Sequence, residues 1–244
     1  MVRTRGGHRG GHVAQPVQQP VQPPVQQPEH RALLDITQVT GIATIDWQTL
    51  AAHHIGHEFA RLYRIGQWPA FFSIQDPIDP QLRFQFMSTF RDLRDDTGYI
   101  TFELAGRGYN ISIETLSQYL DLPPIENPVP LGEWCSPVAI AGFWRNELHI
   151  ADDFVARASK STALPPASRY MQALLSRTLT NRHKSQEKLN YTEMLSLLSM
   201  HRGIALDVAS LFANNLDRRL QQHQSSTLTV GPYVTGIARK LGIF

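Results

Sequence analysis

The stretch "YITFELAGRGYNISI", residues 99–113, changes the spacing of the apolar side chains from helical to alternating. Apolar side chains occupy every second position from Ile100 to Leu104, and the alternation resumes after Gly106 and Gly108. Alternation with a period of two is typical of a half-buried strand, and two glycines between such runs favour a tight turn. The stretch therefore predicts a β-hairpin with Gly106 and Gly108 bracketing its turn.

The chain on both sides of the hairpin has helical periodicity. Upstream, "TIDWQTLAAHHIGHEFARLYRIG" (44–66) predicts one helix that ends at Gly66. A second helix should begin at Asp79-Pro80, because aspartate caps a helix and proline suits its first position. Ser112 should cap a short third helix. Further helices are expected over residues 136–148, 168–180, 190–203, 205–222 and 231–243. The sequence thus predicts an α+β fold that is predominantly α-helical, with one small β-hairpin.

The composition divides the chain into three parts. Residues 1–30 contain glycine and arginine followed by a Pro-Val-Gln-Gln near-repeat, with almost no large apolar side chain, so we expect a disordered N-terminal tail. Residues 31–150 are expected to form a helix-and-hairpin lobe, and residues 151–244 a C-terminal helical bundle. The polar segment 150–165 would connect the two, which either form separate lobes or pack as one domain.

Charge and cysteine content limit the classes of protein. The 244 residues include 23 Lys and Arg against 21 Asp and Glu, a formal charge of +2, so the body as a whole should not attract nucleic acid or membrane strongly. The single cysteine, Cys135, excludes an intramolecular disulfide and a Cys-rich zinc site. No apolar run approaches the length of a membrane helix. We expect a soluble intracellular protein, cytoplasmic or nuclear, without a small-molecule substrate.

The tail is locally basic. Arg3, Arg5 and Arg9 precede any acidic residue, and two of them begin Arg-Gly-Gly triplets. Such triplets can bind RNA through phosphate contacts and stacking of the guanidinium on bases. The sequence therefore offers these arginines as candidate RNA contacts, with a flexible solvated arm as the alternative.

Asp96-Thr97-Gly98 is the triplet that retroviral-type aspartic proteases use to place a catalytic carboxylate. That chemistry needs the aspartate on a loop that leaves an apolar strand, so that two carboxylates share one proton. Here the sequence indicates a charged helix end before the triplet and a strand only after it. We interpret the acids as solvated turn residues; the protease hypothesis would need a dimer that joins two Asp96 loops.

The histidines of residues 44–66 offer a second chemical hypothesis. His53 and His57, like His54 and Glu58, stand four residues apart, a helical spacing that can hold a divalent metal. No third ligand can be named, and the His-Glu-x-x-His order of metalloproteases is absent. A polar helix face explains the pattern equally well. We therefore expect no catalytic residue, no metal and no cofactor.

Two stretches resemble a known family. Residues 99–123 carry a strand, a glycine turn, a second strand and a helix that ends in Leu-x-Leu-Pro, and residues 169–216 with 231–243 carry a second set of motifs. They are similar to the Athila-type plant retrotransposon first-open-reading-frame protein and the related plant transposon protein domain. The matching residues are Arg169-Tyr170, Asn181-Arg182, Leu197-Leu198, Met200 and Gly231 to Ala238.

The resemblance implies a non-enzymatic, Gag-like or accessory protein that associates with proteins or itself and binds nucleic acid. Arg218 and Arg219 are candidate contacts on the body, with complementarity to the helix dipole as the simpler explanation. Two alternatives stay open: a host-domesticated nuclear scaffold similar to plant mobile domain proteins, or a truncated relic. The four tryptophans could anchor an interface with a partner or lie in the hydrophobic core; they are Trp47, Trp68, Trp134 and Trp144.

Overall fold

The computed structural model describes residues 44–126, 136–182, 186–222 and 230–243. Over these residues the fold is α+β and mostly helical, as predicted. The expected N-terminal tail lies outside the described residues, and so do Trp134 and Cys135. None of the helices in the described ranges has the length and apolar character needed to cross a membrane.

The hairpin belongs to a three-stranded antiparallel sheet with the order β1-β2-β3. The predicted strands are β2 (Tyr99–Leu104) and β3 (Arg107–Ile111), and Leu104 pairs with Arg107 across a two-residue turn. Ala105 and Gly106 in that turn have φ of 50° and 73°. Positive φ at both positions is the geometry of a type I′ turn, whose twist matches that of the strands. The turn is therefore shorter than the sequence suggested.

The first strand, β1 (Arg91–Leu93), was missed by the sequence analysis, which extended a helix through it. It pairs with β2, so that Arg91 lies opposite Thr101. Three residues are too few to show a strand period, and both neighbours of the strand are helices: α4 (Pro80–Thr89) and α5 (Arg94–Thr97). The conformation of β1 depends on its pairing with β2. A segment of three residues does not show in its own sequence that it will pair in this way.

The helix expected over residues 44–66 is divided. The structure has α1 (Trp47–Ala52) and α2 (Gly56–Tyr63), and between them His54 adopts a φ of 58°. A left-handed residue ends a helix, so the single continuous helix was a wrong prediction. A further short helix, α3 (Trp68–Ser73), was not predicted, since it is too short to show a period.

The caps that the sequence predicts at Asp79 and Ser112 begin the helices that follow them. The Asp79 side chain accepts from the N–H groups of Gln81 and Leu82 at the start of α4, and Ser112 accepts from Thr115 at the start of α6 (Ile113–Tyr119). The later elements are α8 (Pro137–Gly142), which continues into a π-helix (Phe143–Glu147), a 3₁₀ turn (Ser161–Ala163), α9 (Pro166–Thr178), α10 (Tyr191–Arg202), α11 (Val208–Gln221) and α12 (Gly231–Lys240).

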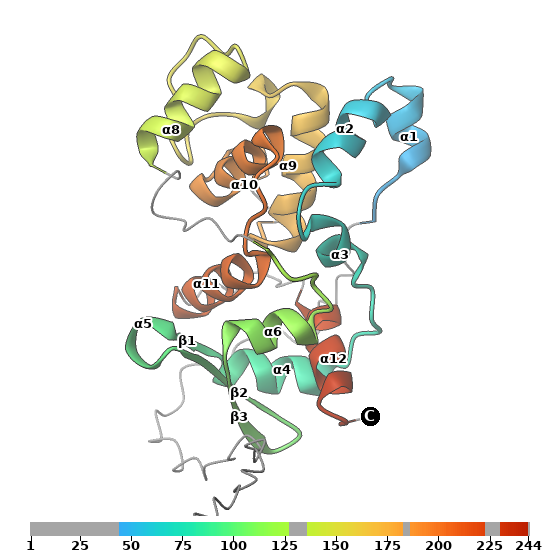
Figure 1. The fold of residues 1–244 in the computed structure, drawn as a ribbon, viewed down its shortest axis with the longest axis vertical. Helices are drawn as coiled ribbons and strands as arrows, with labels where there is room; N and C mark the ends of the chain where they lie inside the picture. The colour runs from blue at the N-terminus through green and yellow to red at the C-terminus, as the bar shows by residue number, and fades with distance from the viewer. Residues whose placement is uncertain (1–43, 127–135, 183–185, 223–229, 244) are drawn as a thin grey trace, which may run out of the picture.

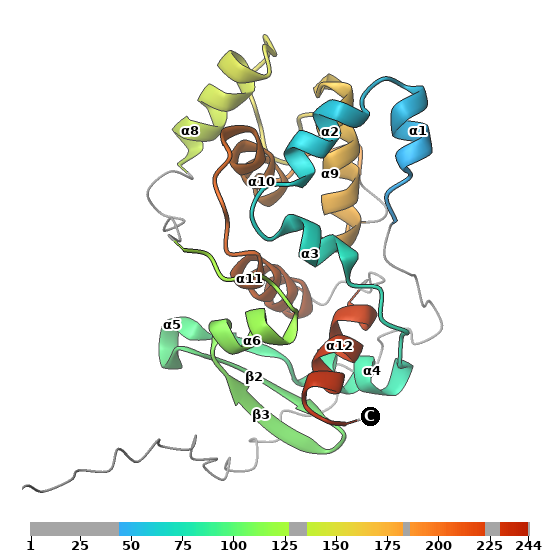
Figure 2. The same ribbon diagram turned by 45° about the vertical axis from the view of Figure 1, so that its right-hand side comes forward.

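These elements pack in two groups joined by α3 and α11 (Figures 1 and 2). One group contains α1, α2, α8, α9 and α10; the other contains the sheet with α4, α6 and α12. Helix α2 packs on α9, and α4 packs on α12, so segments from either side of residue 150 share one hydrophobic core. Trp68 and Trp144 are buried in that core, whereas Trp47 is exposed.

Polar side chains connect the two groups at α11. The buried Gln67 accepts from the N–H of Val208 at 2.9 Å and donates to the carbonyl of Pro123 at 2.8 Å. Arg94 donates to the hydroxyl of Ser210 at 2.7 Å and pairs with Asp92. These bonds fix the N-terminal end of α11 against α3 and the sheet, while residues near its C-terminal end line a polar pocket.

Candidate functional site

The described surface has a polar pocket where the start of α10 lies near the end of α11. The N-terminus of α10 and the C-terminus of α11 meet there, and the Thr192 hydroxyl lies 3.4 Å from Asn215 Oδ1. The cavity has a volume of about 320 Å³. Its walls come from five short segments, and its lining residues are Ala156, Arg157, Thr180, Arg182, Asn190, Tyr191, Thr192, Asn215, Arg218, Arg219 and Gln222.

The lining is strongly cationic. Four of its residues are arginines, and none is an aspartate or a glutamate. Within the described part of the chain, the guanidinium groups of Arg157 and Arg218 have no hydrogen-bond or ion-pair partner, and both side chains are exposed. We call these eleven residues the arginine pocket. A concave surface with several guanidinium groups and no carboxylate is suited to an anion.

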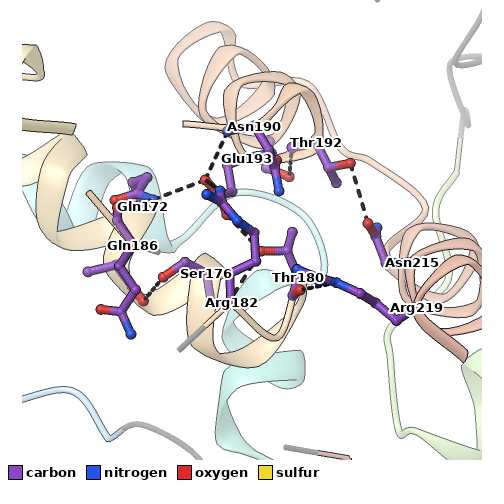
Figure 3. A network of polar contacts seen from close by, with 12 residues as sticks. Gln172, Ser176, Thr180, Arg182, Gln186, Asn190, Thr192, Glu193, Asn215 and Arg219 are labelled. Atoms are coloured by element: carbon purple, nitrogen blue, oxygen red, sulfur yellow. Dashed lines mark hydrogen bonds and ion pairs between the residues drawn. The ribbon is translucent and has the colours of Figure 1, made fainter. Parts of the chain in front are cut away.

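The other two arginines, Arg182 and Arg219, are held in place by bonds to residues of the protein. Arg182 pairs with Glu193, with Nη1 at 3.0 Å from Oε1, and Arg219 Nε donates to the carbonyl of Thr180 at 3.2 Å. Figure 3 shows both contacts, with Arg182 reaching the carboxylate and Arg219 reaching back from α11. These anchored side chains keep positive charge at fixed positions in the pocket.

Glu193 is the centre of a buried polar network. Its fully buried carboxylate also accepts from Gln172 Nε2 at 3.0 Å and from the Thr180 hydroxyl at 2.7 Å (Figure 3). Its position follows from a capping box, in which Asn190 accepts from the N–H of Glu193 and Glu193 accepts from that of Asn190. The start of α10 therefore places the acid below the pocket, where it orients Arg182.

The same cap places an aromatic side chain at the pocket. Tyr191 is the first residue of α10, directly after the Asn190 cap, and 36% of it is exposed. It lines the cavity together with the arginines. Proteins that bind single-stranded nucleic acids combine basic groups, which contact the phosphates, with exposed aromatic rings, on which the bases stack.

Mutual repulsion is present among the arginines. Burial lowers the pKa of Arg219, and the positive charges of Arg182, Arg157 and Arg218 lower the pKa further, against an opposing effect of Glu193. Like charges at close range raise the free energy of the unoccupied pocket. An anion between the guanidinium groups would reverse that effect.

Sequence reasoning identified part of this pocket. It named Arg218 and Arg219 but favoured the helix dipole as their explanation, and it missed Arg157 and Arg182 as members of the same cluster. Nothing in the local sequence connects residues 157, 182 and 218, which only tertiary packing brings together. Arg3, Arg5 and Arg9 lie outside the described residues.

The protease triplet has different surroundings from those predicted. A strand, β1, does precede it, contrary to the sequence analysis, and Asp96 itself lies in the four-residue helix α5. Gly98 ends α5 in the left-handed conformation, with a φ of 77°, as expected of a turn glycine. Asp96 is exposed and does not line the arginine pocket.

The histidines do not form the helix face that their spacing suggested. His53 caps the end of α1 and His57 lies in α2, on the far side of the break at His54. The spacing of four therefore no longer places them on one continuous helix. Among the residues that the structure describes, no group of three or more His, Cys, Asp or Glu side chains could hold a metal ion.

A buried serine and a half-buried histidine form a pair elsewhere in the fold. The Ser168 hydroxyl is 2.9 Å from His201 Nε2, and Ser168 has no exposed surface. Burial lowers the pKa of His201 to about 4, helped by the positive charge of Arg61 and opposed by Glu147. Because a substrate cannot reach Ser168, the pair contributes to packing and to pH dependence of stability.

Comparison of the chain with protein-family models, with curated proteins and with solved structures gave no match in any of the three searches. The arginine pocket and the sequence are therefore the only indications of function among the described residues.

Proposed function

We propose that this protein is a non-catalytic nucleic-acid-binding protein of retroelement origin, which holds single-stranded RNA at the arginine pocket. The observation that carries the proposal is the presence of Arg157, Arg182, Arg218 and Arg219 around one cavity with no carboxylate in its lining. Cations concentrated in this way release the counterions of a phosphate backbone, which is the main source of affinity for nucleic acids.

The position of Tyr191 favours nucleic acid over a simple anion. A sulfate or phosphate ion would need only the guanidinium groups, whereas a base can stack on the exposed ring beside them. Stacking tolerates any base, so we propose binding with little sequence preference. The formal charge of the whole chain is only +2, which is too small to attract RNA to the entire surface. We therefore propose that RNA binds at the pocket.

The N-terminal arginines extend the proposed contact. Arg3, Arg5 and Arg9 precede the first acidic residue, so we propose that they are additional contacts for the phosphates of the same RNA. The retroelement origin and a capacity for self-association come from the resemblance of residues 99–123 and 169–243 to the Athila-type proteins.

The test is the affinity of the full-length protein for a fluorescent single-stranded RNA, measured by anisotropy at low and at physiological salt. Replacing Arg157 and Arg218 together by alanine should weaken binding by roughly tenfold and reduce its salt dependence, since two phosphate contacts are removed. Both side chains are exposed and make no bond within the described residues, so the fold should survive.

A matched control keeps the change of charge the same. Arg64 caps the end of α2 and Arg107 begins β3; both are exposed, and neither lines the pocket. The double variant Arg64→Ala with Arg107→Ala should bind RNA as the unaltered protein does. Equal losses in both double variants would indicate attraction by net charge alone and contradict a pocket-centred function.

A further inference from the structure

The shape of the arginine pocket limits what part of a strand it can hold. Its lining residues come from the start of α10, from the C-terminal end of α11, and from two connecting segments that contain Arg157 and Arg182, so the cavity has walls on several sides. A volume of about 320 Å³ is of the order of one nucleotide and is at the small end of ligand pockets. Proteins that bind the interior of a long strand have instead a groove that holds several nucleotides.

The charge of the pocket exceeds what one internal phosphate needs. Of the four arginines, Arg182 is paired with Glu193 and Arg219 donates to the Thr180 carbonyl, whereas the guanidinium groups of Arg157 and Arg218 have no partner within the described residues. A phosphodiester inside a strand carries one negative charge, whereas a terminal phosphate monoester carries close to two near neutral pH. Two charges and three terminal oxygens can engage more guanidinium groups at once than a diester can.

The arrangement of anchored and unengaged arginines supports the same ligand. Arg182 and Arg219 are fixed by Glu193 and by the Thr180 carbonyl, which prepares two donors before a ligand arrives. Arg157 and Arg218, which have no partner within the described residues, can then close on a phosphate from the exposed side. Prepared donors reduce the ordering cost of binding, and the exposed pair completes the contact.

We propose that the arginine pocket binds the phosphorylated end of a single strand, with the terminal phosphate among the arginines and the terminal base on Tyr191. This inference rests on the proposed nucleic-acid-binding function and names the part of the strand that the pocket takes. A strand that ends in the pocket also agrees with a cavity of one-nucleotide size.

The experiment compares three RNAs of one sequence, about eight nucleotides long. The first has a 5′-phosphate, the second a 3′-phosphate and the third hydroxyl groups at both ends. Each is titrated against the full-length protein at physiological salt. At least one phosphorylated RNA should bind about fivefold or more tightly than the unphosphorylated RNA, because the added charge and oxygens meet the arginines. The Arg157→Ala, Arg218→Ala double variant should lose this preference.

Variants of Tyr191 separate stacking from charge. Tyr191→Ala should weaken binding of the phosphorylated RNA but leave the inhibitory strength of inorganic phosphate unchanged, and Tyr191→Phe should behave as the unaltered protein does. The side chain is exposed and begins its helix, so these changes should not disturb the core. Adenosine 5′-monophosphate should compete with the RNA more strongly than adenosine.

The outcomes distinguish this inference from the function on which it rests. Equal affinity for all three RNAs, lost in the Arg157→Ala, Arg218→Ala variant, would overturn the strand-end inference and leave the proposed function intact. No binding to any of the RNAs would overturn both. A phosphotyrosine peptide that binds more tightly than the phosphorylated RNA would also overturn the inference, since it would assign the pocket to a protein partner.

Discussion

Glu193 and Arg182 form a buried ion pair at the base of the arginine pocket, in which Arg182 Nη1 lies 3.0 Å and 3.1 Å from the two carboxylate oxygens. The side chain of Glu193 is fully buried and that of Arg182 is 9% exposed. A pair so far from water stabilises the fold only while both charges are present. The pair therefore links the stability of the C-terminal helices to the geometry of the pocket.

Replacement of Glu193 by glutamine should lower the free energy of unfolding by about 3 kcal/mol, because it leaves the Arg182 charge buried without its partner. Urea denaturation followed by circular dichroism measures the change. Glu187 is an exposed glutamate on the neighbouring connection, and Glu187→Gln should change the stability by less than about 0.5 kcal/mol. Equal stability of the Glu193→Gln variant and the unaltered protein would show that the polar network around Glu193 does not stabilise the fold.

His201 should make stability fall in mildly acidic solution. Its pKa is about 4 in the folded protein against an ordinary value of 6.5 for histidine, so between these pH values the unfolded chain binds more protons. Stability then rises with pH across that window and is lost as pH falls from about 6.5 towards 4. Because the ring is only partly buried, we expect a loss of about 1–2 kcal/mol.

The measurement is urea denaturation of the unaltered protein and of His201→Gln at about pH 7 and pH 5. Glutamine keeps a polar group near Ser168 but does not titrate in this range. The groups facing His201 are Arg61, Glu147, Ser168 and Phe143, and all remain in the variant. The same decrease in both proteins would assign the pH dependence to other residues.

Gly231 at the start of α12 should not tolerate a side chain. A Cβ there would lie 2.6 Å from Ile78 Cγ2, so Gly231→Ala should destabilise the protein by about 1–3 kcal/mol. Gly142 in α8 is the matched control, since its Cβ would meet only Asn146 Nδ2, at 3.9 Å. Alanine at residue 142 should be neutral or stabilise by up to about 1 kcal/mol. Thermal unfolding of the two variants should therefore shift in different directions or by clearly different amounts.

Asp96 should be dispensable for both stability and binding. Asp96→Asn removes the carboxylate that a protease would need, yet the residue is exposed in α5 and does not line the arginine pocket. We expect unchanged unfolding and unchanged RNA affinity, within about 0.5 kcal/mol. Cleavage of the chain or of an added peptide by the purified protein, abolished by this substitution, would revive the protease hypothesis.

Much of the fold could be predicted from local chemistry. The caps at Asp79 and Ser112 each bond to the helix that follows them, and the alternation in residues 99–113 indicates the buried face of the hairpin. Caps and periods act over a few residues, so they can be read from one sequence. For the same reason the sequence missed β1, whose conformation depends on a partner strand.

The break at His54 and the arginine pocket show where local reasoning ends. Residues 44–66 have an apolar period compatible with one helix, and only the packing of α1 and α2 decides that His54 turns left-handed. Arg157, Arg182 and Arg218 come from three different segments, and no spacing rule connects them. The four arginines gather because α9 packs on α10 and the end of α11 is bonded to Thr180 and Thr192, which is a tertiary property.

The most direct test of the central claim is ultraviolet cross-linking of the full-length protein to single-stranded RNA, followed by mass spectrometry of the cross-linked peptides. The account predicts cross-links in the segment that contains Tyr191 and in residues 215–222, both lost in the Arg157→Ala, Arg218→Ala variant. Cross-links in other parts of the chain alone, unaffected by that variant, would contradict it.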